Sequence, residues 1–367
     1  MKVVVAMSGG VDSSVTAGLL VEQGHEVIGV HMKLHDATGG GPGRCCGFDD
    51  ALDARAVADA LAIPFYVFNL RDAFKKAVMD DLVGTYLAGE TPNPCIQCNG
   101  VLKFRVLMAR ARALGATHLA TGHYARILDG PGGPELATAI DTRKDQTYFL
   151  FPMKQAVLAH TLFPLGGMTK PEVRAVAERM GMATAAKPES QEICFIPDDD
   201  HGRFVKETSG VNGAGPILDE DGRIVGQHDG YYRFTVGQRR GLGVSLGAPA
   251  YVTGVDAASR AVRVTTRPDR LRSRGLHAQR VNWFRHPEPT EPVQVRIRHR
   301  GGPIPAVVEG TADAPYIRFL EPAHAVAPGQ AAVVYQGERV LGGGWIARAE
   351  PWLDPSPTPT DAPQGAR

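Results

Sequence analysis

The residues with the clearest chemical potential form a short stretch near the start of the chain, Ser8-Gly-Gly-Val-Asp-Ser-Ser14. It lies between an apolar run and a segment with helical spacing, so it is expected to turn a strand into a helix. Glycines let the backbone approach a ligand closely, and N–H groups at a helix N-terminus attract anions. The serine hydroxyls add donors, and Asp12 can cap the helix or coordinate Mg²⁺. The stretch predicts a phosphate site.

This stretch contains no lysine, and it matches neither G-x-x-x-x-G-K-[ST] nor G-x-G-x-x-G. It resembles instead the pyrophosphate loop of the ATP-pyrophosphatase superfamily, whose members cleave ATP between the α and β phosphates. That resemblance implies a loop that holds a departing pyrophosphate with backbone amides, hydroxyls and Mg²⁺. The alternative is a glycine- and serine-rich helix cap that binds no ligand.

The cysteines are the second group of reactive side chains. An odd number of them in a long chain argues against a structural disulfide framework. Three interpretations remain open: a zinc or iron–sulfur site, inert core thiols, or a pair that carries and resolves a persulfide. Cys98 lies just before a predicted helix, whose N-terminus would favour a thiolate. The five cysteines are Cys45, Cys46, Cys95, Cys98 and Cys194.

Alternating strands and helices must position these residues in the first half of the chain. This alternation predicts a parallel sheet with helices on both faces. Strands are predicted at 3–6, 26–32, 64–68 and 118–121. Helices are predicted at 12–23, 49–62, 73–87, 99–114 and 168–181.

After about residue 200 helical periodicity is nearly absent, and turn residues separate short β-like runs. This alternation of short β-like runs and turns predicts an all-β half built of small barrels. The final segment is rich in proline, threonine, aspartate and serine and is expected to be disordered. The β-like runs are 215–218, 230–235, 250–255, 293–297 and 331–335.

Composition places the chain among ordinary globular proteins, with 367 residues, 43% of them hydrophobic and 22% charged. There is neither an 18-residue apolar run nor a secretory signal, so we expect no membrane span and a cytoplasmic location. The net charge is +1, yet residues 260–300 hold eleven arginines, no lysine and three acidic residues. Such a stretch is a candidate binding surface for a polyanion. Alternatively, it is an arginine-rich β surface exposed to solvent.

Seven motifs in order extend the resemblance over residues 1 to about 350. They are SGGVDSS, TPNPC-x-x-CN, ATGHYAR, KDQTYFL, ESQEICF, TVGQRRGLG and PGQAAVVY. Together they resemble the bacterial tRNA-specific 2-thiouridylase family. The resemblance implies a parallel-sheet ATP-pyrophosphatase domain followed by two small mostly-β domains, the last a β-barrel. The implied boundaries are 1–200 for the ATP-binding catalytic domain, 201–268 for the central domain, 269–350 for the tRNA-binding barrel and 351–367 for the tail.

The family is known for ATP-dependent thiolation of the wobble uridine, position 34 of tRNA. ATP adenylates the 2-oxygen of the uridine, and a persulfide sulfur then replaces AMP. The resemblance therefore implies ATP and Mg²⁺ as cofactors and the tRNA anticodon stem-loop as a partner. A relay protein or a cysteine desulfurase would donate the persulfide sulfur. We expect a monomer that does not contact a membrane.

The resemblance also assigns roles to individual residues. Cys98 is implied as the nucleophile and Cys194 as the persulfide carrier, the two closing a transient disulfide. Contacts with ATP are implied for Ala6, Met7, Ser8, Gly9, Gly10, Val11, Asp12, Ser13, Met32 and Gly122. Contacts with the target base are implied for Asn93, Pro94 and Cys95. Contacts with tRNA are implied for His123, Lys144, Asp145, Gln146, Arg298, His299 and Gln330. No residue is implied as a ligand of a resident metal.

One position departs from the family pattern, because many members have aspartate where this chain has Cys95. A thiol supplies no permanent carboxylate, so we interpret Cys95 as a small wall residue. It could instead be a third redox-active thiol, or it could form an off-pathway bridge with Cys98. No role is assigned to Cys45 and Cys46. Trp283 and Phe284 could stack on bases but are expected to fill the core of the C-terminal barrel.

Two rival functions differ in what they require. Another ATP-pyrophosphatase, such as an amide synthetase, would adenylate a small substrate and would need neither Cys98 nor Cys194. A non-catalytic tRNA-binding protein would need no intact nucleotide loop.

Overall fold

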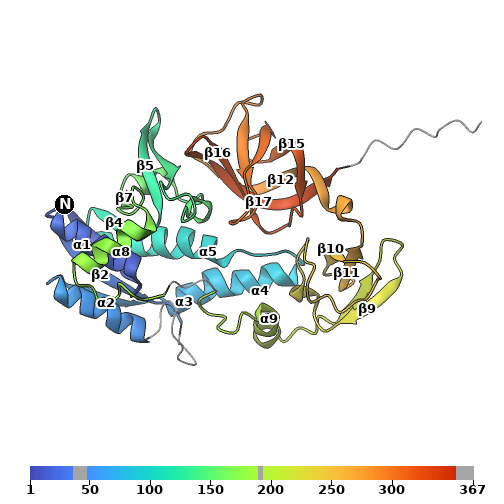
Figure 1. Cartoon of the computed structure of the whole chain (residues 1–367), viewed down its shortest axis with the longest axis horizontal. Helices are drawn as coiled ribbons and strands as arrows, with labels where there is room; N and C mark the ends of the chain where they lie inside the picture. Colours follow the sequence, from blue (N-terminus) through green and yellow to red (C-terminus); the bar gives the residue numbers. More distant parts are fainter. Residues whose placement is uncertain (36–47, 189–192, 353–367) are drawn as a thin grey trace, which may run out of the picture.

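The computed structural model describes residues 1–35, 48–188 and 193–352. Figure 1 shows a sheet-and-helix region on the left, a barrel at the upper right and a smaller β region at the lower right. The predicted loop at 39–47, with Cys45 and Cys46, lies outside the described residues, as do 189–192 and the tail from 353. Within the described residues no helix is long and apolar enough to cross a membrane.

The first region is built on a parallel sheet, in the order β3-β2-β1-β4-β7. Val3, Val4 and Val5 of β1 are completely buried, as expected for a central strand covered on both faces. The chain passes from β1 to β2 on one side and later returns to β4 on the other, and ligands in such sheets bind at this switch point. The strands are β1 (Lys2–Ala6), β2 (Glu26–Lys33), β3 (Phe65–Asn69), β4 (His118–Thr121) and β7 (Thr161–Leu162).

Helices flank this sheet largely where the sequence predicts them. They are α1 (Val11–Glu22), α2 (Phe48–Ala60) and α8 (Lys170–Arg179). One continuous segment joins α3 (Arg71–Phe74), the π-helical η1 (Lys75–Met79) and α4 (Asp80–Leu87). A second joins α5 (Pro94–Gln97), the π-helical η2 (Cys98–Leu107) and α6 (Met108–Ala113).

The helix predicted to begin at residue 99 in fact begins at Pro94, which is a correction. Asn93 caps it, because its side chain accepts a hydrogen bond from the Ile96 N–H, and proline suits the first helical position. Cys98 therefore lies inside the helix rather than just before it. The shift matters because it places Cys95 and Cys98 on the same helical segment.

A hairpin and several short elements, absent from the sequence-based prediction, complete this region. The hairpin pairs β5 with β6 in antiparallel fashion and rises from the sheet edge toward the barrel (Figure 1). These elements are β5 (Ala125–Gly130), β6 (Gly133–Thr138), η3 (Thr147–Phe149) and α7 (Gln155–Leu158).

The central region is not purely β, because α9 (His201–Ser209) precedes its sheet. The sequence carried signals for this helix: the Asp200 side chain accepts from the Arg203 N–H, and Gly210 ends the helix at φ 67°. The sheet has the order β10-β11-β8-β9. Its strands are β8 (Gly215–Leu218), β9 (Ile224–His228), β10 (Tyr251–Asp256) and β11 (Ala261–Thr265).

The strand predicted at 230–235 is wrong, since a 3₁₀ turn, η4 (Tyr231–Arg233), occupies this position. Tyr231 and Tyr232 are both buried, which an alternating strand does not allow but a tight turn does. The Tyr231 hydroxyl donates to the Leu87 carbonyl at 2.8 Å, so the turn joins the central region to α4.

Six antiparallel strands close into a barrel at the C-terminal end, in the order β12-β15-β14-β13-β16-β17 with β17 pairing back to β12. Trp283 packs against the hydrophobic cluster of the barrel, as predicted, whereas Phe284 packs against the larger cluster shared with the first region. The last strand runs to Pro351, one residue into the segment predicted as a tail. After η5 (Pro268–Leu271), the strands are β12 (Arg272–Trp283), β13 (Val293–Arg296), β14 (Ile304–Gly310), β15 (Pro315–His324), β16 (Ala331–Gln336) and β17 (Arg339–Pro351).

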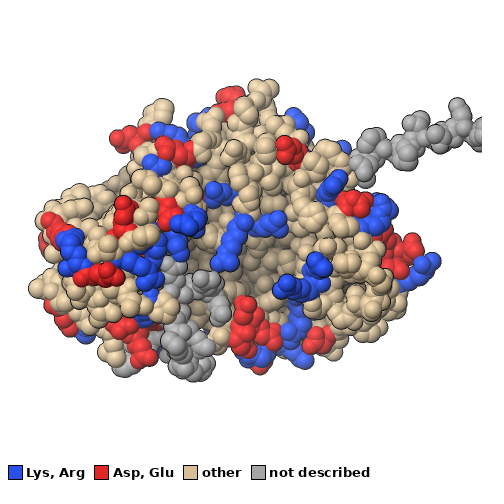
Figure 2. All heavy atoms as spheres, viewed as in Figure 1, with Lys and Arg blue, Asp and Glu red and all other residues tan. Residues whose placement is uncertain are grey.

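The barrel is attached to the first region by buried polar contacts. The Asn282 amide donates to the carbonyls of Phe151 and Met153 at 2.7 and 2.8 Å. The Gln330 amide donates to the carbonyls of Thr91 and Pro92, both at 3.1 Å. The face in Figure 2 is hollowed between the two regions, and lysine and arginine side chains gather around this hollow.

Candidate active site

A cavity of about 410 Å³ opens at the switch point of the parallel sheet. Residues of several segments line it, among them the loop after β1, the segment after β4, the start of the helix at Pro94 and the residues around Cys194. The end of β2, α2, the α3–η1 segment and residues 144–149 contribute as well. Its volume lies within the usual range for small-molecule sites, roughly 300–1,000 Å³. The cavity therefore brings together motifs that lie far apart in the chain.

The glycine- and serine-rich loop is closed by its own hydroxyls. Those of Ser13 and Ser14 each donate to the Gly10 carbonyl at 3.0 Å, and the Ser8 N–H donates to Ser13 Oγ at 3.1 Å. The first N–H groups of α1 have no acceptor within the helix, and Val11, Asp12 and Ser13 line the cavity. Backbone amides rather than serine hydroxyls are thus the donors left for an anion.

Two glycines fit this loop for steric reasons. Gly9 has φ 79°, and a Cβ there would lie 2.3 Å from the Asp50 carbonyl oxygen. Gly122 packs directly on the first turn of α1, where a Cβ would lie 2.8 Å from the Asp12 carbonyl carbon. Gly122 lines the cavity, whereas Gly9 supports the loop from outside the lining.

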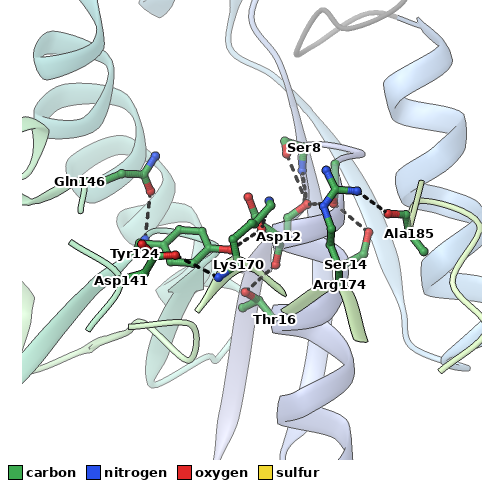
Figure 3. Close-up of polar contacts among 12 residues, drawn as sticks. Ser8, Asp12, Ser14, Thr16, Tyr124, Asp141, Gln146, Lys170, Arg174 and Ala185 are labelled. Atoms are coloured by element: carbon green, nitrogen blue, oxygen red, sulfur yellow. Dashed lines mark hydrogen bonds and ion pairs between the residues drawn. The ribbon is translucent and has the colours of Figure 1, made fainter. Parts of the chain in front are cut away.

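Asp12 does not cap its helix, which corrects one expectation from the sequence. The N-cap of α1 is Gly10, without a side-chain bond. The Asp12 carboxylate instead accepts from Lys170 Nζ at 2.7 Å and from the Tyr124 hydroxyl at 2.9 Å (Figure 3). The loop lacks a lysine of its own, but α8 supplies one to it.

Lys187 is a second lysine brought to the loop from a distant segment. Its Nζ donates to the Gly9 carbonyl at 3.1 Å and to the carboxylates of Asp50 and Asp53 at 2.7 and 2.5 Å. Burial opposes the charge, but these two carboxylates raise the pKa of the Lys187 ammonium. Lys187 therefore stays positive at the edge of the cavity and ties the chain before Cys194 to the phosphate loop.

His123 lies at the cavity wall and is almost wholly buried. Its Nδ1 lies 2.7 Å from Thr121 Oγ1, and its Nε2 lies 3.5 Å from Lys103 Nζ. Burial and the Lys103 charge lower the pKa of His123 well below its usual value, so the ring is neutral at pH 7. A neutral ring can accept from Lys103, and it holds this ammonium at the cavity.

The thiols of Cys95, Cys98 and Cys194 all line the same cavity, and none of them is in a disulfide. Cys98 and Cys194 are half-buried and pack on the same hydrophobic cluster, whereas Cys95 is exposed. Among the described residues no group of three histidine, cysteine or acidic side chains could hold a metal ion. This geometry favours thiol chemistry for the three described cysteines.

The cavity is lined by most of the residues expected at the nucleotide and target base. These are Ala6, Met7, Ser8, Gly10, Val11, Asp12, Ser13, Met32, Gly122, Pro94 and Cys95, together with His123, Lys144 and Gln146. Asn93 lies at its edge as the helix cap. Gln146 also fixes the segment after β4, because its side-chain oxygen accepts from the Tyr124 N–H at 3.0 Å.

The remaining expected tRNA contacts lie outside the lining. Asp145 is buried and accepts from the Thr147 hydroxyl and from Arg296, the latter at 2.9 Å. The His299 ring lies 4.4 Å from the Phe149 ring, and burial and nearby arginines lower its pKa. Gln330 contacts the loop before Pro94, as described above. His299 and Gln330 thus connect the barrel to Phe149 of the cavity lining and to the loop before Pro94.

Four functional candidates were missed by sequence reasoning: Lys103, Tyr124, Lys170 and Lys187. Tyr124 and Lys187 adjoin recognised motifs, so proximity in sequence was the available signal. Lys170 opens a helix with a capping box, which reads as structure alone. Lys103 lies on the π-helical η2 and lines the cavity together with Cys98 and Asn99, and no motif in the sequence marks it.

Comparisons with known proteins agree along nearly the whole described chain. Family models match residues 1–198 (tRNA methyl transferase HUP domain), 202–266 (tRNA methyl transferase PRC-barrel domain) and 273–346 (Aminomethyltransferase beta-barrel domain). A curated relative from Geotalea uraniireducens (strain Rf4), tRNA-specific 2-thiouridylase MnmA, is 51% identical over 358 residues and covers 95% of both chains. A relative of the same name from Rhodospirillum centenum is 48% identical, with 98% of this chain and 96% of the relative covered.

Solved structures match more weakly. A 4-thiouridine synthetase–RNA complex with bound ATP is 19% identical with a TM-score of 0.38, over 53% of this chain and 44% of that one. An NMN synthetase from Francisella tularensis is 18% identical with a TM-score of 0.33, over 57% of this chain and 76% of that one.

Proposed function

Because the chain belongs to the tRNA-specific 2-thiouridylase family, we propose that it thiolates position 2 of the wobble uridine, position 34 of tRNA, through an adenylated intermediate. Membership of this family makes the chain a tRNA sulfurtransferase. One observation carries the mechanism: the phosphate loop, Cys98 and Cys194 line one cavity. A nucleotide and two thiols can therefore act on one base in turn.

ATP fits the nucleotide side of this cavity. The amides at the start of α1 face the cavity, with Met32 on the neighbouring strand as a wall for adenine. The cavity offers the carboxylates of Asp12 and Asp50, each already held by a lysine. Mg²⁺ would therefore arrive with the ATP phosphates and neutralise their charge, and the carboxylates of Asp12 and Asp50 could help to hold it.

In the first step, the 2-oxygen of the uridine attacks the α-phosphorus of ATP. The bond to the β-phosphate oxygen breaks, pyrophosphate leaves with the electron pair, and the uridine N3 proton is lost. The α1 amides and the Lys187 ammonium stabilise the departing charge. Lys103, whose ammonium lies 3.5 Å from Nε2 of the neutral His123 ring, also lines the cavity and is placed to stabilise the charge on AMP.

In the second step, sulfur replaces AMP. Cys194 carries a persulfide, and the Cys98 thiolate attacks its Sγ and breaks the S–S bond. The terminal sulfur keeps the electron pair and bonds to C2 of the uridine, while AMP leaves with the former 2-oxygen. A Cys98–Cys194 disulfide remains, and a two-electron reductant must reopen it before the next turnover.

The target base would enter beside Pro94 and Cys95, at the open end of the cavity. The base must leave the anticodon stack, which costs a few kcal/mol and is cheapest in a single-stranded loop. His299, which packs on Phe149 of the cavity lining, and Gln330, which holds the loop before Pro94, are the barrel residues that we propose beside this route. We propose a protein persulfide as the sulfur donor and a monomeric enzyme.

The decisive experiment incubates the protein with ATP, Mg²⁺, a persulfide source and unmodified tRNA. Thiouridine is detected by retarded migration on a mercury-containing gel. Wild type should form product only with ATP, and Cys98→Ser and Cys194→Ser should each lose at least 100-fold. Cys95→Ser is the matched control and should stay near wild type. ATP-independent product, or full activity of Cys194→Ser, would refute the mechanism.

A further inference from the structure

Arg280 occupies an unusual position in the barrel wall. Its backbone has φ 51°, and among the described non-glycine residues with positive φ it is the one inside a strand. The pairing of β12 with β17 slips between Gln279 and Asn282, so Arg280 and Val281 form a bulge. Bulges of this kind re-aim side chains and often lie beside active sites. The chain keeps an arginine where glycine would be relaxed.

At this bulge the Arg280 side chain packs on an aromatic ring. Its guanidinium carbon lies 4.8 Å from the centroid of the Trp345 ring. The Trp345 ring also packs against the Phe151 ring, with centroids 5.1 Å apart. Arg280 itself is exposed. With one face of the guanidinium covered, its N–H edge remains for a planar or bidentate acceptor such as a phosphate.

Neighbouring contacts link this pair to the loop that leads into the cavity lining at Pro94. Trp345 precedes Ile346, whose N–H bonds to the Gln330 carbonyl, and the Gln330 amide holds the loop that leads into Pro94. The Arg280 charge also reaches Asp81, whose carboxylate accepts from Gln97 between the two cysteines of the helix. Burial raises the pKa of Asp81, and the Arg280 charge opposes this shift.

We propose that Arg280, seated on Trp345, binds a backbone phosphate of the tRNA next to the nucleotide that enters the cavity. This contact rests on the proposed function, because it presumes tRNA as the substrate. The contact would also explain why an arginine is kept at a positive φ. In this proposal the strained backbone directs the guanidinium toward the tRNA. Phosphate contacts of this kind fix the position of the tRNA on the protein, while the residues of the cavity carry out the reaction.

The test uses Arg280→Gly, which removes the side chain and relieves the backbone. The matched control is Arg260→Gly, since Arg260 is also exposed and has φ 55° but lies in the turn between β10 and β11. Binding of unmodified tRNA is measured by filter retention across a salt series, with ATP affinity and melting temperature recorded for each variant. Arg280→Lys is included because it keeps the charge without the planar fork.

Arg280→Gly should weaken tRNA binding about tenfold and lower the slope of log K against log salt by about 0.7, the value for one phosphate contact with a single strand. Its melting temperature and ATP affinity should match or exceed wild type. Arg280→Lys should keep the slope with weaker binding, and Arg260→Gly should bind like wild type. An unchanged slope in Arg280→Gly, a lower melting temperature, or an equal loss in Arg260→Gly would each overturn the proposal. Wild type that fails to bind or thiolate tRNA would instead refute the proposed function.

Discussion

At the scale of residues, the lysines around the phosphate loop are held by specific partners. Lys170 is almost wholly buried and its ammonium lies 2.7 Å from Asp12, at the first turn of α1. Lys187 holds Gly9 and Asp50, and Lys103 is held by His123. A loop that lacks a lysine in sequence is thus surrounded by three ammonium groups in space.

Removing Lys170 should expose the anionic ATP phosphates to an uncompensated Asp12. We expect Lys170→Met to weaken ATP binding at least tenfold, about 1.4 kcal/mol. Asp12→Asn in the same chain should recover part of this loss, because the repelling charge is gone. Isothermal titration with ATP measures the cycle. Strictly additive losses would show that the pair does not act as a unit.

His123 should make the fold sensitive to acid. Its native pKa is depressed, so between that pKa and about 6.5 the unfolded chain binds more protons than the native one. Stability should therefore be fully present above pH 7 and fall as pH drops below about 6.5. Urea unfolding at pH 7.5 and 5.5 should show a smaller loss for His123→Asn than for wild type. Equal losses would contradict a neutral buried His123.

At the scale of elements, the contact between β4 and α1 is set by Gly122. Gly122→Ala would press a methyl group on the Asp12 backbone and shift the first turn of α1, which holds the phosphate amides. We expect ATP affinity to fall more than tenfold while melting changes by a few degrees. The control is Gly167→Ala, where a Cβ meets nothing within 4 Å. Wild-type ATP affinity in Gly122→Ala would show that this contact is not tight.

The elements that sequence reasoning predicted well are those whose signal is local. Buried valines, helical spacing and terminal glycines identify β1, α1 and β2 nearly to the residue. The start of the helix at Pro94 was missed because a weak local signal, Asn93 before a proline, was read as loop. The strand predicted at 230–235 failed because packing of two neighbouring tyrosines, with one bonded to the end of α4, overrode an apolar pattern.

Only part of the candidate site could be predicted from the sequence. Motif residues of the phosphate loop and the cysteines could be identified along the chain, and the structure places them around one cavity. The lysines could not, because Lys103 lines the cavity without belonging to a motif and Lys170 depends on packing of α8 against α1. Such contacts arise from tertiary structure, and a single sequence has no local pattern for them.

At the scale of the whole molecule, the barrel must be docked accurately on the catalytic region for a tRNA to reach the cavity. Asn282 is central to this docking, since its buried amide satisfies two carbonyls and its oxygen accepts from Lys154 at 2.8 Å. Asn282→Ala would leave these groups unpaired. Each buried polar group so orphaned costs about 1–3 kcal/mol.

We therefore expect Asn282→Ala to loosen the barrel while leaving the nucleotide side of the cavity intact. Its tRNA affinity should fall several-fold, cleavage by a protease near the domain junction should rise, and ATP affinity should stay within about twofold of wild type. The matched control is Gln336→Ala, because Gln336 is another amide of the barrel, but it contacts Arg285 and Glu291 within the barrel itself. Equal behaviour of the two variants would argue against a docking role.

The central claim is that one cavity exchanges a uridine oxygen for sulfur through Cys98 and Cys194. Its most direct test is a single turnover, without reductant, of persulfide-loaded protein with ATP and unmodified tRNA, followed by mass spectrometry of both products. The account predicts one Cys98–Cys194 disulfide for each thiouridine formed, and neither product when ATP is omitted. Thiouridine formed without that disulfide, or with a disulfide between other cysteines, would contradict it.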